Sequence, residues 1–369
     1  MSKWEKINLS ELAECLDSRR VPVKENERIE GAIPYYGANG QVGWIDRAIF
    51  NEPLLLIAED GGHFDEPDRG VAYLISGPSW VNNHAHVLRA KSNRVMLEFL
   101  GYYFSHFNFL PYITGSTRQK LNQKDLFKVD IPLPPLAEQE RIVSILDEAE
   151  EMKRLRAQAN LCTADLSPAL FDGMFGDPVR NTNGFPTYKL KQLGRVTTGT
   201  TPPSVMEGMF GGEIPFITPG DLEIDTSNPK RYVTTSGANE SRVVRAGSTL
   251  VCCIGATIGK ADIAKKSSAF NQQINAIEWN ESVDDFYGLF CMRRFSYFIA
   301  RLGGAFALPI LKKSLFEEIE IPVPPIAVQK EFSTRVKEIR AFSLDQSATE
   351  QKLESLFQSL LHRAFAGEL

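Results

Sequence analysis

One segment in the first third of the chain carries hydroxyl groups, cations and a glycine in close succession, Thr114-Gly-Ser-Thr-Arg-Gln-Lys120. Hydroxyls and cations hydrogen-bond to phosphate oxygens, and an arginine can donate two parallel bonds to the major-groove edge of guanine. We therefore expect nucleic-acid contacts here, although a solvated turn before a strand would have the same composition. The expected contacts are Ser116, Thr117, Arg118, Lys120 and Lys124.

Two earlier segments carry groups that suit base reading or phosphate binding. Asn39 and Gln41 have side-chain amides, which can pair with adenine through two hydrogen bonds, and Tyr36 lies just before them. An ordinary tight turn is the alternative for this glycine-containing segment. Arg19 and Arg20 form a pair of cations that either holds phosphates or is simply solvated.

Corresponding candidates occur in the second half of the chain. Thr198-Gly-Thr-Thr-Pro-Pro-Ser204 occupies a comparable early position there, and Lys260 ends a glycine turn. Gln273 precedes an apolar strand, so its amide either holds the strand edge, which we favour, or faces nucleic acid. A pair of lysines follows a glycine-rich stretch that lacks hydroxyls and amides. The expected contacts are Thr200, Thr201, Ser204, Lys260, Gln273, Lys312 and Lys313.

The spacing of several other motifs argues against catalysis and cofactor binding. Gly255-Ala-Thr-Ile-Gly-Lys260 has three residues between its glycines and an alanine after its lysine, whereas a nucleotide phosphate loop has four and then serine or threonine. Thr201-Pro-Pro-Ser204 lacks the flanking residues of an adenine methyltransferase motif. His84 and His86 have no further metal ligands nearby, and the cysteines show no ligand spacing. We expect no catalytic residue, metal or cofactor in this chain.

The elements that position these candidates are duplicated along the sequence. Ile131-Pro-Leu-Pro-Pro-Leu-Ala-Glu-Gln139 returns as Ile321-Pro-Val-Pro-Pro-Ile-Ala-Val-Gln329, displaced by 190 residues (321 − 131). Val81–Leu88 aligns with Phe270–Ile277, and Glu98–Tyr103 aligns with Asp285–Phe290. Self-similarity over so long a period indicates a repeated architecture. The loops differ most between the copies, as expected if one scaffold carries two binding surfaces.

Each copy is predicted to contain a β-rich region with glycines at its turns, followed by a long helix. Buried strands are predicted at 54–58, 71–75 and 249–254, and shorter helices at 95–106 and 285–298. The predicted fold class is therefore α+β, with two similar mixed α/β domains separated by two long helices in a pseudo-two-fold repeat. The expected boundaries are 1–130 and 179–320 for the two domains, with 131–178 and 321–369 for the two helical regions.

Both long helices begin after a Pro-Pro pair, whose second proline suits the first helical position. Their apolar residues recur at spacings of three and four, which predicts a coiled-coil seam interrupted by Arg156 and Gln346. A helix from Pro135 to near Leu170 would be about 50 Å long, or some one and a half turns of DNA. Such a spacer would separate two reading domains by a fixed distance along one duplex. The seam consists of Ile142, Ile145, Ala149 and Met152 on the first helix, and of Val336, Ile339, Leu353, Phe357 and Leu360 on the second.

Bulk composition limits the class of protein. A chain of 369 residues is long enough for two domains, and 43% hydrophobic with 24% charged residues is typical of a globular protein. A net charge of −5 argues against a protein that coats itself in nucleic acid but does not exclude local binding. Since there is no apolar run long enough for a membrane span and no signal peptide, we expect a cytoplasmic protein without a membrane partner.

Together these motifs resemble the DNA-specificity subunits of type I restriction–modification systems over essentially the whole chain. The resemblance is carried by Leu133-Pro-Pro-Leu-Ala-Glu-Gln139 with its second copy, Gly255–Lys260 followed by Asn271-Gln-Gln273, and the ending Arg363-Ala-Phe-Ala-Gly-Glu-Leu369. It implies two target-recognition domains that each bind half of a bipartite site in double-stranded DNA. It also implies antiparallel helical regions between those domains.

The resemblance further implies partners that perform the chemistry. Two methyltransferase subunits would dock on the helical regions, and restriction/translocase subunits would join the full complex. S-adenosylmethionine, ATP and Mg²⁺ would then be bound by those partners. The second proline copy has Val328-Gln-Lys330 where the first has Glu138-Gln-Glu140, so a shared role for the acidic pair is in doubt. The expected methyltransferase-docking residues are Leu136, Glu138, Gln139, Ile326 and Gln329.

Two alternatives remain open from the sequence. The repeats could provide two docking surfaces for other proteins without any DNA specificity, or the chain could be a stand-alone nuclease or methylase. Methyl transfer or cleavage by the purified chain alone would support the second alternative.

Replacing Arg118 by alanine should weaken DNA binding by the assembled methylase complex, because one phosphate or guanine contact is lost. Titration of DNA at several salt concentrations measures both the affinity and its salt slope. An unchanged affinity together with an unchanged slope would count against this contact.

Inserting four residues near Gln158 should lengthen the unread gap between the half-sites by roughly one or two base pairs, since one helical turn rises about 5.4 Å. Mapping methylated bases in DNA exposed to the variant complex measures the gap. A gap of wild-type length would remove the proposed role of the helix as a spacer.

Overall fold

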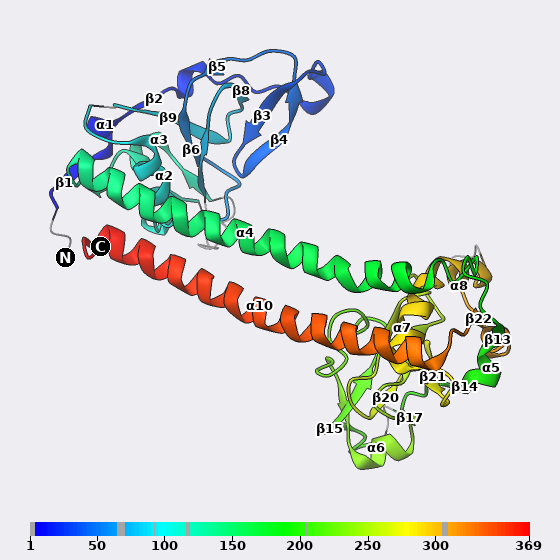
Figure 1. Cartoon of the computed structure of the whole chain (residues 1–369). Coiled ribbons are helices and arrows are strands. Elements are labelled where there is room, and N and C mark those ends of the chain that lie inside the picture. Colours follow the sequence, from blue (N-terminus) through cyan, green and yellow to red (C-terminus); the bar gives the residue numbers. More distant parts are fainter. Residues whose placement is uncertain (1–3, 65–70, 92, 116–118, 204–205, 305–308) are drawn as a thin grey trace. The chain divides into compact units, whose positions relative to one another are not determined.

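The computed structural model describes residues 4–64, 71–91, 93–115, 119–203, 206–304 and 309–369 (Figure 1). The chain forms two compact units: unit 1 is Met1–Ala157 with Thr349–Leu369, and unit 2 is Gln158–Ala348. Two long helices, α4 (Leu136–Phe175) and α10 (Ile326–Ala366), each contribute residues to both units. Within the described residues, no helix is long and apolar enough to cross a bilayer.

Unit 1 contains two four-stranded sheets, with strand orders β2-β9-β6-β7 and β4-β3-β8-β5, and the two-stranded pairs β1-β12 and β10-β11. Its shorter helices are α1 (Leu9–Leu12), α2 (Leu97–Ser105) and α3 (Gln123–Leu126). Its strands are β1 (Lys6–Asn8), β2 (Ala13–Cys15), β3 (Ile33–Gly37), β4 (Gly40–Ile45), β5 (Phe50–Asn51), β6 (Leu54–Ala58), β7 (Ala72–Ile75), β8 (Pro78–Val81), β9 (Ala85–Ala90), β10 (Ile113–Thr114), β11 (Lys120–Leu121) and β12 (Asp130–Pro132).

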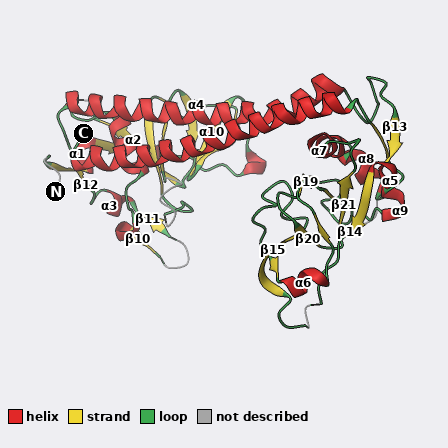
Figure 2. Ribbon diagram, turned by 60° about the horizontal axis from the view of Figure 1, so that its bottom comes forward, coloured by secondary structure: helices red, strands yellow, loops and turns green. Residues whose placement is uncertain are grey.

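Unit 2 repeats this plan, with strand orders β14-β21-β18-β19 and β16-β15-β20-β17 and the pair β13-β22 (Figure 2). Its shorter helices are α5 (Leu190–Leu193), α6 (Thr235–Asn239), α7 (Asp285–Arg294), α8 (Ser296–Leu302) and α9 (Lys313–Phe316). Its strands are β13 (Thr187–Lys189), β14 (Gly194–Thr198), β15 (Phe210–Ile217), β16 (Tyr232–Val233), β17 (Val243–Val244), β18 (Thr249–Cys252), β19 (Ala261–Ile263), β20 (Ser268–Phe270), β21 (Ile274–Trp279) and β22 (Glu320–Pro322).

The strand register shows the same duplication residue by residue. Among the described residues each unit has one parallel strand pairing, β3 with β8 in unit 1 and β15 with β20 in unit 2. His86 lies opposite Ile57 in the first unit, and Asn275 lies opposite Val251 in the second. The alignment of Val81–Leu88 with Phe270–Ile277 therefore matches the paired strands, and the predicted α+β repeat is confirmed.

Several local predictions need correction. Strand β6 is fully buried as expected, but β7 is only partly buried. The helix predicted over 285–298 is interrupted at Phe295, so that α7 and α8 are separate. Helix α4 continues through Pro168 to Phe175, beyond the expected end near Leu170. Continuation is possible because Pro168 lies on a helix whose last turns are packed in the core of unit 2.

Each core is completed by the carboxyl-terminal end of a long helix. In unit 1, the Phe365 ring of α10 lies 5.4 Å from Phe99 of α2. In unit 2, the Phe175 ring of α4 lies 4.9 Å from Tyr287 of α7. Aromatic side chains bury large apolar areas, so these contacts stabilise both units strongly. The end of the first repeat's helix thus belongs to unit 2, and the end of the second repeat's helix belongs to unit 1.

The two long helices are antiparallel where they pair. In unit 2, Thr163 donates to the Gln346 side chain at 3.1 Å, and the Phe171 ring lies 5.5 Å from Phe332. Later residues of α4 therefore meet earlier residues of α10. The expected seam is only partly apolar, since Met152 is 46% exposed whereas Gln346 is buried and hydrogen-bonded.

A buried glutamine joins each proline turn to the helix packed beside it. The Gln139 side chain accepts from the Met96 amide at 2.8 Å and donates to the Arg94 and Pro134 carbonyls at 3.0 and 2.8 Å. Both glutamines have no exposed surface. Gln329 makes the equivalent bonds to the Asp284 amide and to the Ser282 and Pro324 carbonyls, at 2.9, 3.0 and 2.8 Å.

Gln139 and Gln329 were expected to dock a partner, but neither side chain is accessible. These two amides therefore do not themselves contact a partner. Their shared place in the two proline motifs is explained by this internal clamp. Each clamp satisfies backbone groups at the start of α2 or α7 that would otherwise lack partners.

Replacing Gln139 by leucine should destabilise unit 1 by about 2–4 kcal/mol, because three backbone groups lose their partner and one of them, the Pro134 carbonyl, is buried. Hydrogen exchange measures the local effect, and the Met96 amide should exchange faster than in the wild type. Glu140→Gln on the exposed side of the same turn is the matched control and should leave exchange unchanged. Wild-type protection of Met96 in the leucine variant would show that the clamp contributes little.

Candidate nucleic-acid interface

The segment that follows β6 brings several predicted contact residues together in unit 1. The Glu59 carboxylate pairs with Arg20 at 2.7 Å and with Lys120 at 3.0 Å. The Asn39 amide donates to the Gly61 carbonyl at 2.9 Å, and Gly61 has a φ of 69° that favours glycine. We call Glu59–Gly61 and the side chains bonded to it the β6 loop cluster. The Asn39 and Lys120 side chains of this cluster are at least partly exposed, whereas the ion-paired Arg20 and Glu59 side chains are nearly buried.

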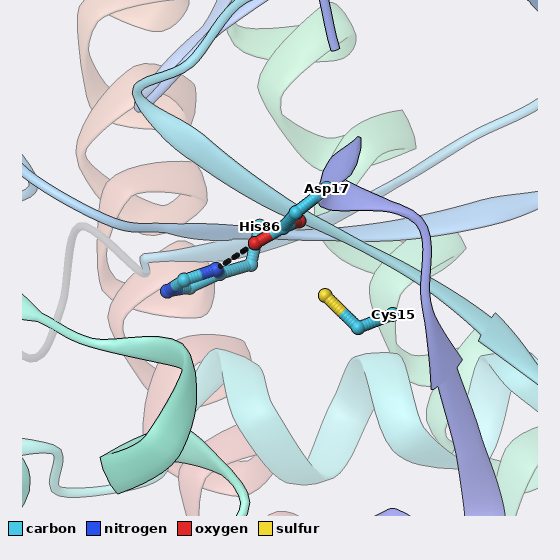
Figure 3. A group of neighbouring side chains, drawn as sticks. All are labelled: Cys15, Asp17 and His86. Atoms are coloured by element: carbon cyan, nitrogen blue, oxygen red, sulfur yellow. Dashed lines mark hydrogen bonds and ion pairs between the residues drawn. The ribbon is translucent and has the colours of Figure 1, made fainter. Parts of the chain in front are cut away.

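A buried histidine, His86, lies next to this cluster, with its Nδ1 3.9 Å from the Glu59 carboxylate. Figure 3 shows His86 beside Asp17. His86 Nδ1 lies 2.6 Å from the Asp17 carboxylate, and Nε2 lies 2.8 Å from the Leu121 carbonyl. A carbonyl and a carboxylate are both hydrogen-bond acceptors, so the ring is held between two fixed acceptor groups. Burial alone would raise the pKa of Asp17, but His86, the Val87 amide and Arg20 hold that pKa below its ordinary value.

Cys15 lies near Asp17 and His86, and one ligand atom of each falls within 4.8 Å of the others (Figure 3). The group does not suit a metal ion. Both His86 nitrogens already lie against protein acceptors, so a metal would have to displace one of these contacts. Burial raises the pKa of Cys15 to about 12, so its thiol stays protonated at neutral pH. These three residues therefore form an internal polar network.

The two predicted arginines have different places. Arg20 is nearly buried in ion pairs with Asp17 and Glu59, so we expect it to support the cluster rather than touch phosphate. Arg19 is partly exposed and contacts Glu52 at 3.3 Å and the Phe50 ring at 4.6 Å. The Arg19 side chain thus lies beside β5, whereas the neighbouring Arg20 side chain lies beside Glu59.

Other predicted contacts in unit 1 are more accessible. Gln41 is exposed on β4, Lys124 is exposed on α3, and half-buried Tyr36 packs near Tyr73 with ring centroids 6.1 Å apart. Lys120 keeps 45% of its side chain exposed while it pairs with Glu59. Three predicted contacts lie outside the described residues, namely Ser116, Thr117 and Arg118.

In unit 2 some of the predicted contacts lie at the end of β18, and Thr200 and Thr201 follow β14. The exposed Thr201 hydroxyl donates to Gln272 at 2.6 Å, and Thr200 is also exposed. Lys260 ends a turn and pairs with Glu223 at 3.3 Å. The Gln273 side chain accepts from Asn271 at 2.9 Å, which fits the strand-edge role that the sequence favours.

The remaining candidates of unit 2 lie beside the same strand end. Lys312 directly follows Leu311, whose amide donates to the Cys253 carbonyl at 2.8 Å. Lys312 and Lys313 are both exposed, and Lys313 pairs with Glu317 at 3.2 Å. Ser204 lies outside the described residues.

The backbone around both strand ends is the same. The Leu121 amide donates to the Glu59 carbonyl at 2.8 Å, which matches the Leu311–Cys253 bond. Single bridges join Asp60 to Lys120 in unit 1 and Ile254 to Ile310 in unit 2. Each unit therefore presents different side chains from one common backbone geometry.

Sequence reasoning missed the residues that support these surfaces. Asp17, Glu59 and Asn275 hold backbone and side chains in place, yet none of them belongs to a recognisable motif. The alignment of His86 with Asn275 was the available signal, because it places a polar residue at one buried position in both repeats.

The three other expected docking residues are at least partly accessible at the starts of the long helices. Leu136 is 38% exposed, Ile326 is half-buried, and the Glu138 carboxylate pairs with Arg141 at 3.0 Å. Further along, both helices expose large apolar side chains, which mark protein interaction surfaces when they gather. The exposed residues of this kind are Leu155, Leu161, Leu166, Phe342, Leu344 and Leu356.

The matches to known proteins agree with this architecture. The family model for the type I restriction modification DNA specificity domain matches residues 1–160 and 183–355. A putative type I restriction enzyme specificity subunit, S.HindORF215P of Haemophilus influenzae, is 38% identical over 139 residues. That match covers 38% of this chain and 35% of the relative, so it spans about a third of the relative's length. The putative MjaX specificity subunit of Methanocaldococcus jannaschii is 23% identical over 303 residues, which cover 77% of this chain and 70% of that protein.

Solved structures share the fold over almost the whole chain. The S subunit from M. genitalium superposes with a TM-score of 0.62 at 15% identity, covering 99% of this chain and 96% of that one. The HsdS subunit from Thermoanaerobacter tengcongensis gives a TM-score of 0.51 at 20% identity and covers 99% and 97% of the two chains. Since the family model matches nearly all of both repeats, this chain belongs to the DNA specificity subunits of type I restriction–modification systems.

Proposed function

We propose that each unit reads one half of a bipartite sequence in double-stranded DNA. The observation that carries the proposal is the common backbone at the ends of β6 and β18, which presents unlike side chains in the two units. Asn39, Gln41 and Lys120 are the principal contacts of unit 1. Thr200, Thr201 and Lys260 are those of unit 2, with Lys312 and Lys313 beside them.

The chemistry of these groups fits binding rather than bond breaking. Amides read base edges, hydroxyls hold phosphates, and lysines hold either phosphates or the O6 and N7 atoms of guanine. Burial would raise the pKa of Glu59, but hydrogen bonds from Arg20 and Lys120 keep it below its ordinary value, so this carboxylate stays ionised in its ion pairs. Target selection is thus the role of this chain, and methyl transfer, ATP hydrolysis and cleavage are roles of its partners.

Two methyltransferase subunits dock on α4 and α10 in this proposal, and restriction/translocase subunits join them. The exposed apolar side chains of both helices support a protein-covered surface, and Leu136 and Ile326 extend it toward the helix starts. S-adenosylmethionine, ATP and Mg²⁺ would be held by the partners. The complex would act in the cytoplasm, where its DNA substrate lies.

The rival function is a docking scaffold without DNA specificity, which the same helix surfaces would also serve. Mapping modified bases in DNA exposed to the chain and its methyltransferase partners separates the two. Specific reading should give two short sequence blocks at a fixed spacing. Methylation without any shared sequence would contradict the proposed reading and favour the scaffold.

Lys260→Ala should weaken binding of that complex to all sequences about equally and reduce the magnitude of its salt slope by about one, as expected for a lost phosphate contact. Lys266→Ala is the matched control, because Lys266 is exposed beyond the opposite end of β19. Equal effects of the two substitutions would argue against a local contact at Lys260. Affinity titrations at several salt concentrations provide the measurement.

A further inference from the structure

The two units differ in how they fill one buried position of their shared backbone. In unit 1, His86 lies on β9 with Asp17 beside it at 2.6 Å. In unit 2, the register places Asn275 at the position of His86, and the Thr198 hydroxyl donates to Asn275 at 2.7 Å. A pair that includes the Asp17 carboxylate in one unit thus corresponds to a neutral hydroxyl–amide pair in the other.

The Asp17–His86 pair of unit 1 is bonded to the strand that carries Lys120. His86 Nε2 bonds to the Leu121 carbonyl at 2.8 Å, so the ring connects β9 to β11. Asp17 also accepts from the Val87 amide at 2.8 Å and pairs with Arg20 at 3.2 Å. With His86 only 1% exposed, water does not compete for these bonds.

A second set of bonds reaches the Lys120 side chain itself. Arg20 donates to the Ala85 carbonyl at 2.6 Å and to Glu59 at 2.7 Å, and Glu59 in turn pairs with Lys120 at 3.0 Å. Cys253 occupies the place of Glu59 in unit 2, as the matched backbone bonds show. Burial raises the pKa of Cys253 to about 12, so that position carries no charge.

We propose that Asp17, Arg20, Glu59 and His86 are positioning residues that set the sequence discrimination of unit 1 by fixing β11 and Lys120. This inference rests on the proposed function, because it assumes that unit 1 reads DNA near Lys120. None of the four residues needs to touch DNA. They act by holding one backbone strand and one lysine side chain against the end of β6.

A merely structural role would predict loss of stability without a specific loss of discrimination. Removing His86 alone leaves the Asp17 carboxylate without one of its partners, whereas replacing both residues by a neutral pair avoids this. Thr198 and Asn275 of unit 2 supply such a pair. The double variant Asp17→Thr/His86→Asn places the neutral pair of unit 2 in unit 1 and provides the stable test protein, with His86→Asn alone as the single variant.

The experiment uses the full chain assembled with its methyltransferase partners and a DNA library randomised at both half-sites. We expect the double variant to lose about tenfold in the ratio between cognate and singly mismatched DNA at one half-site, which is the usual scale for one misread position. The other half-site should keep its wild-type ratio. Hydrogen exchange at the Leu121 amide should be faster, which reports the freed strand.

Thr198→Val is the matched control, because it removes the hydroxyl of the neutral pair in unit 2 and leaves the network of unit 1 intact. It should leave discrimination unchanged at the half-site that the double variant affects. Wild-type discrimination by the double variant, or equal loss at both half-sites, would overturn the positioning role. If the proposed function is wrong, the wild-type complex itself will select no sequence. That result differs from failure of the positioning role, in which the wild-type complex still selects its sequence.

Discussion

Burial of the aromatic ends of α4 and α10 is the interaction on which both units depend. Phe171 and Phe175 lie in the core of unit 2, and Phe357 and Phe365 pack in unit 1. Each cluster closes one side of a domain whose sheets come from the other repeat. Because dense aromatic packing tolerates few alternatives, it fixes where each long helix ends.

The glutamine clamps connect the long helices to the elements that pack on the sheets. Gln139 and Gln329 connect the start of a long helix to the start of α2 or α7 through their side-chain amides. The helices α2 and α7 pack in turn against the buried sheets that end at Glu59 and Cys253. The surfaces proposed to read DNA are therefore short loops on a rigid base, and their side chains can differ while the backbone stays the same.

Much of this architecture could be predicted from the sequence because duplication is visible without any structure. The proline motifs, the buried strand 54–58 and the two long helices were all evident in local patterns. Residues such as Asp17 and Glu59 were not, because their partners His86 and Lys120 are distant in sequence and meet only in the folded unit. The same limit applies to Gln139, whose place in a motif suggested an exposed role although its amide is internal.

The division of each core between both repeats has a consequence for synthesis on the ribosome. The strands of unit 1 are made before those of unit 2, yet its apolar face receives Phe357, Leu361 and Ala364 only from the last turns of α10. Until α10 has been made, that face lacks these three side chains. The nascent unit 1 must therefore wait, with apolar surface open to chaperones or to aggregation, until the strands of unit 2 and then α10 have followed it.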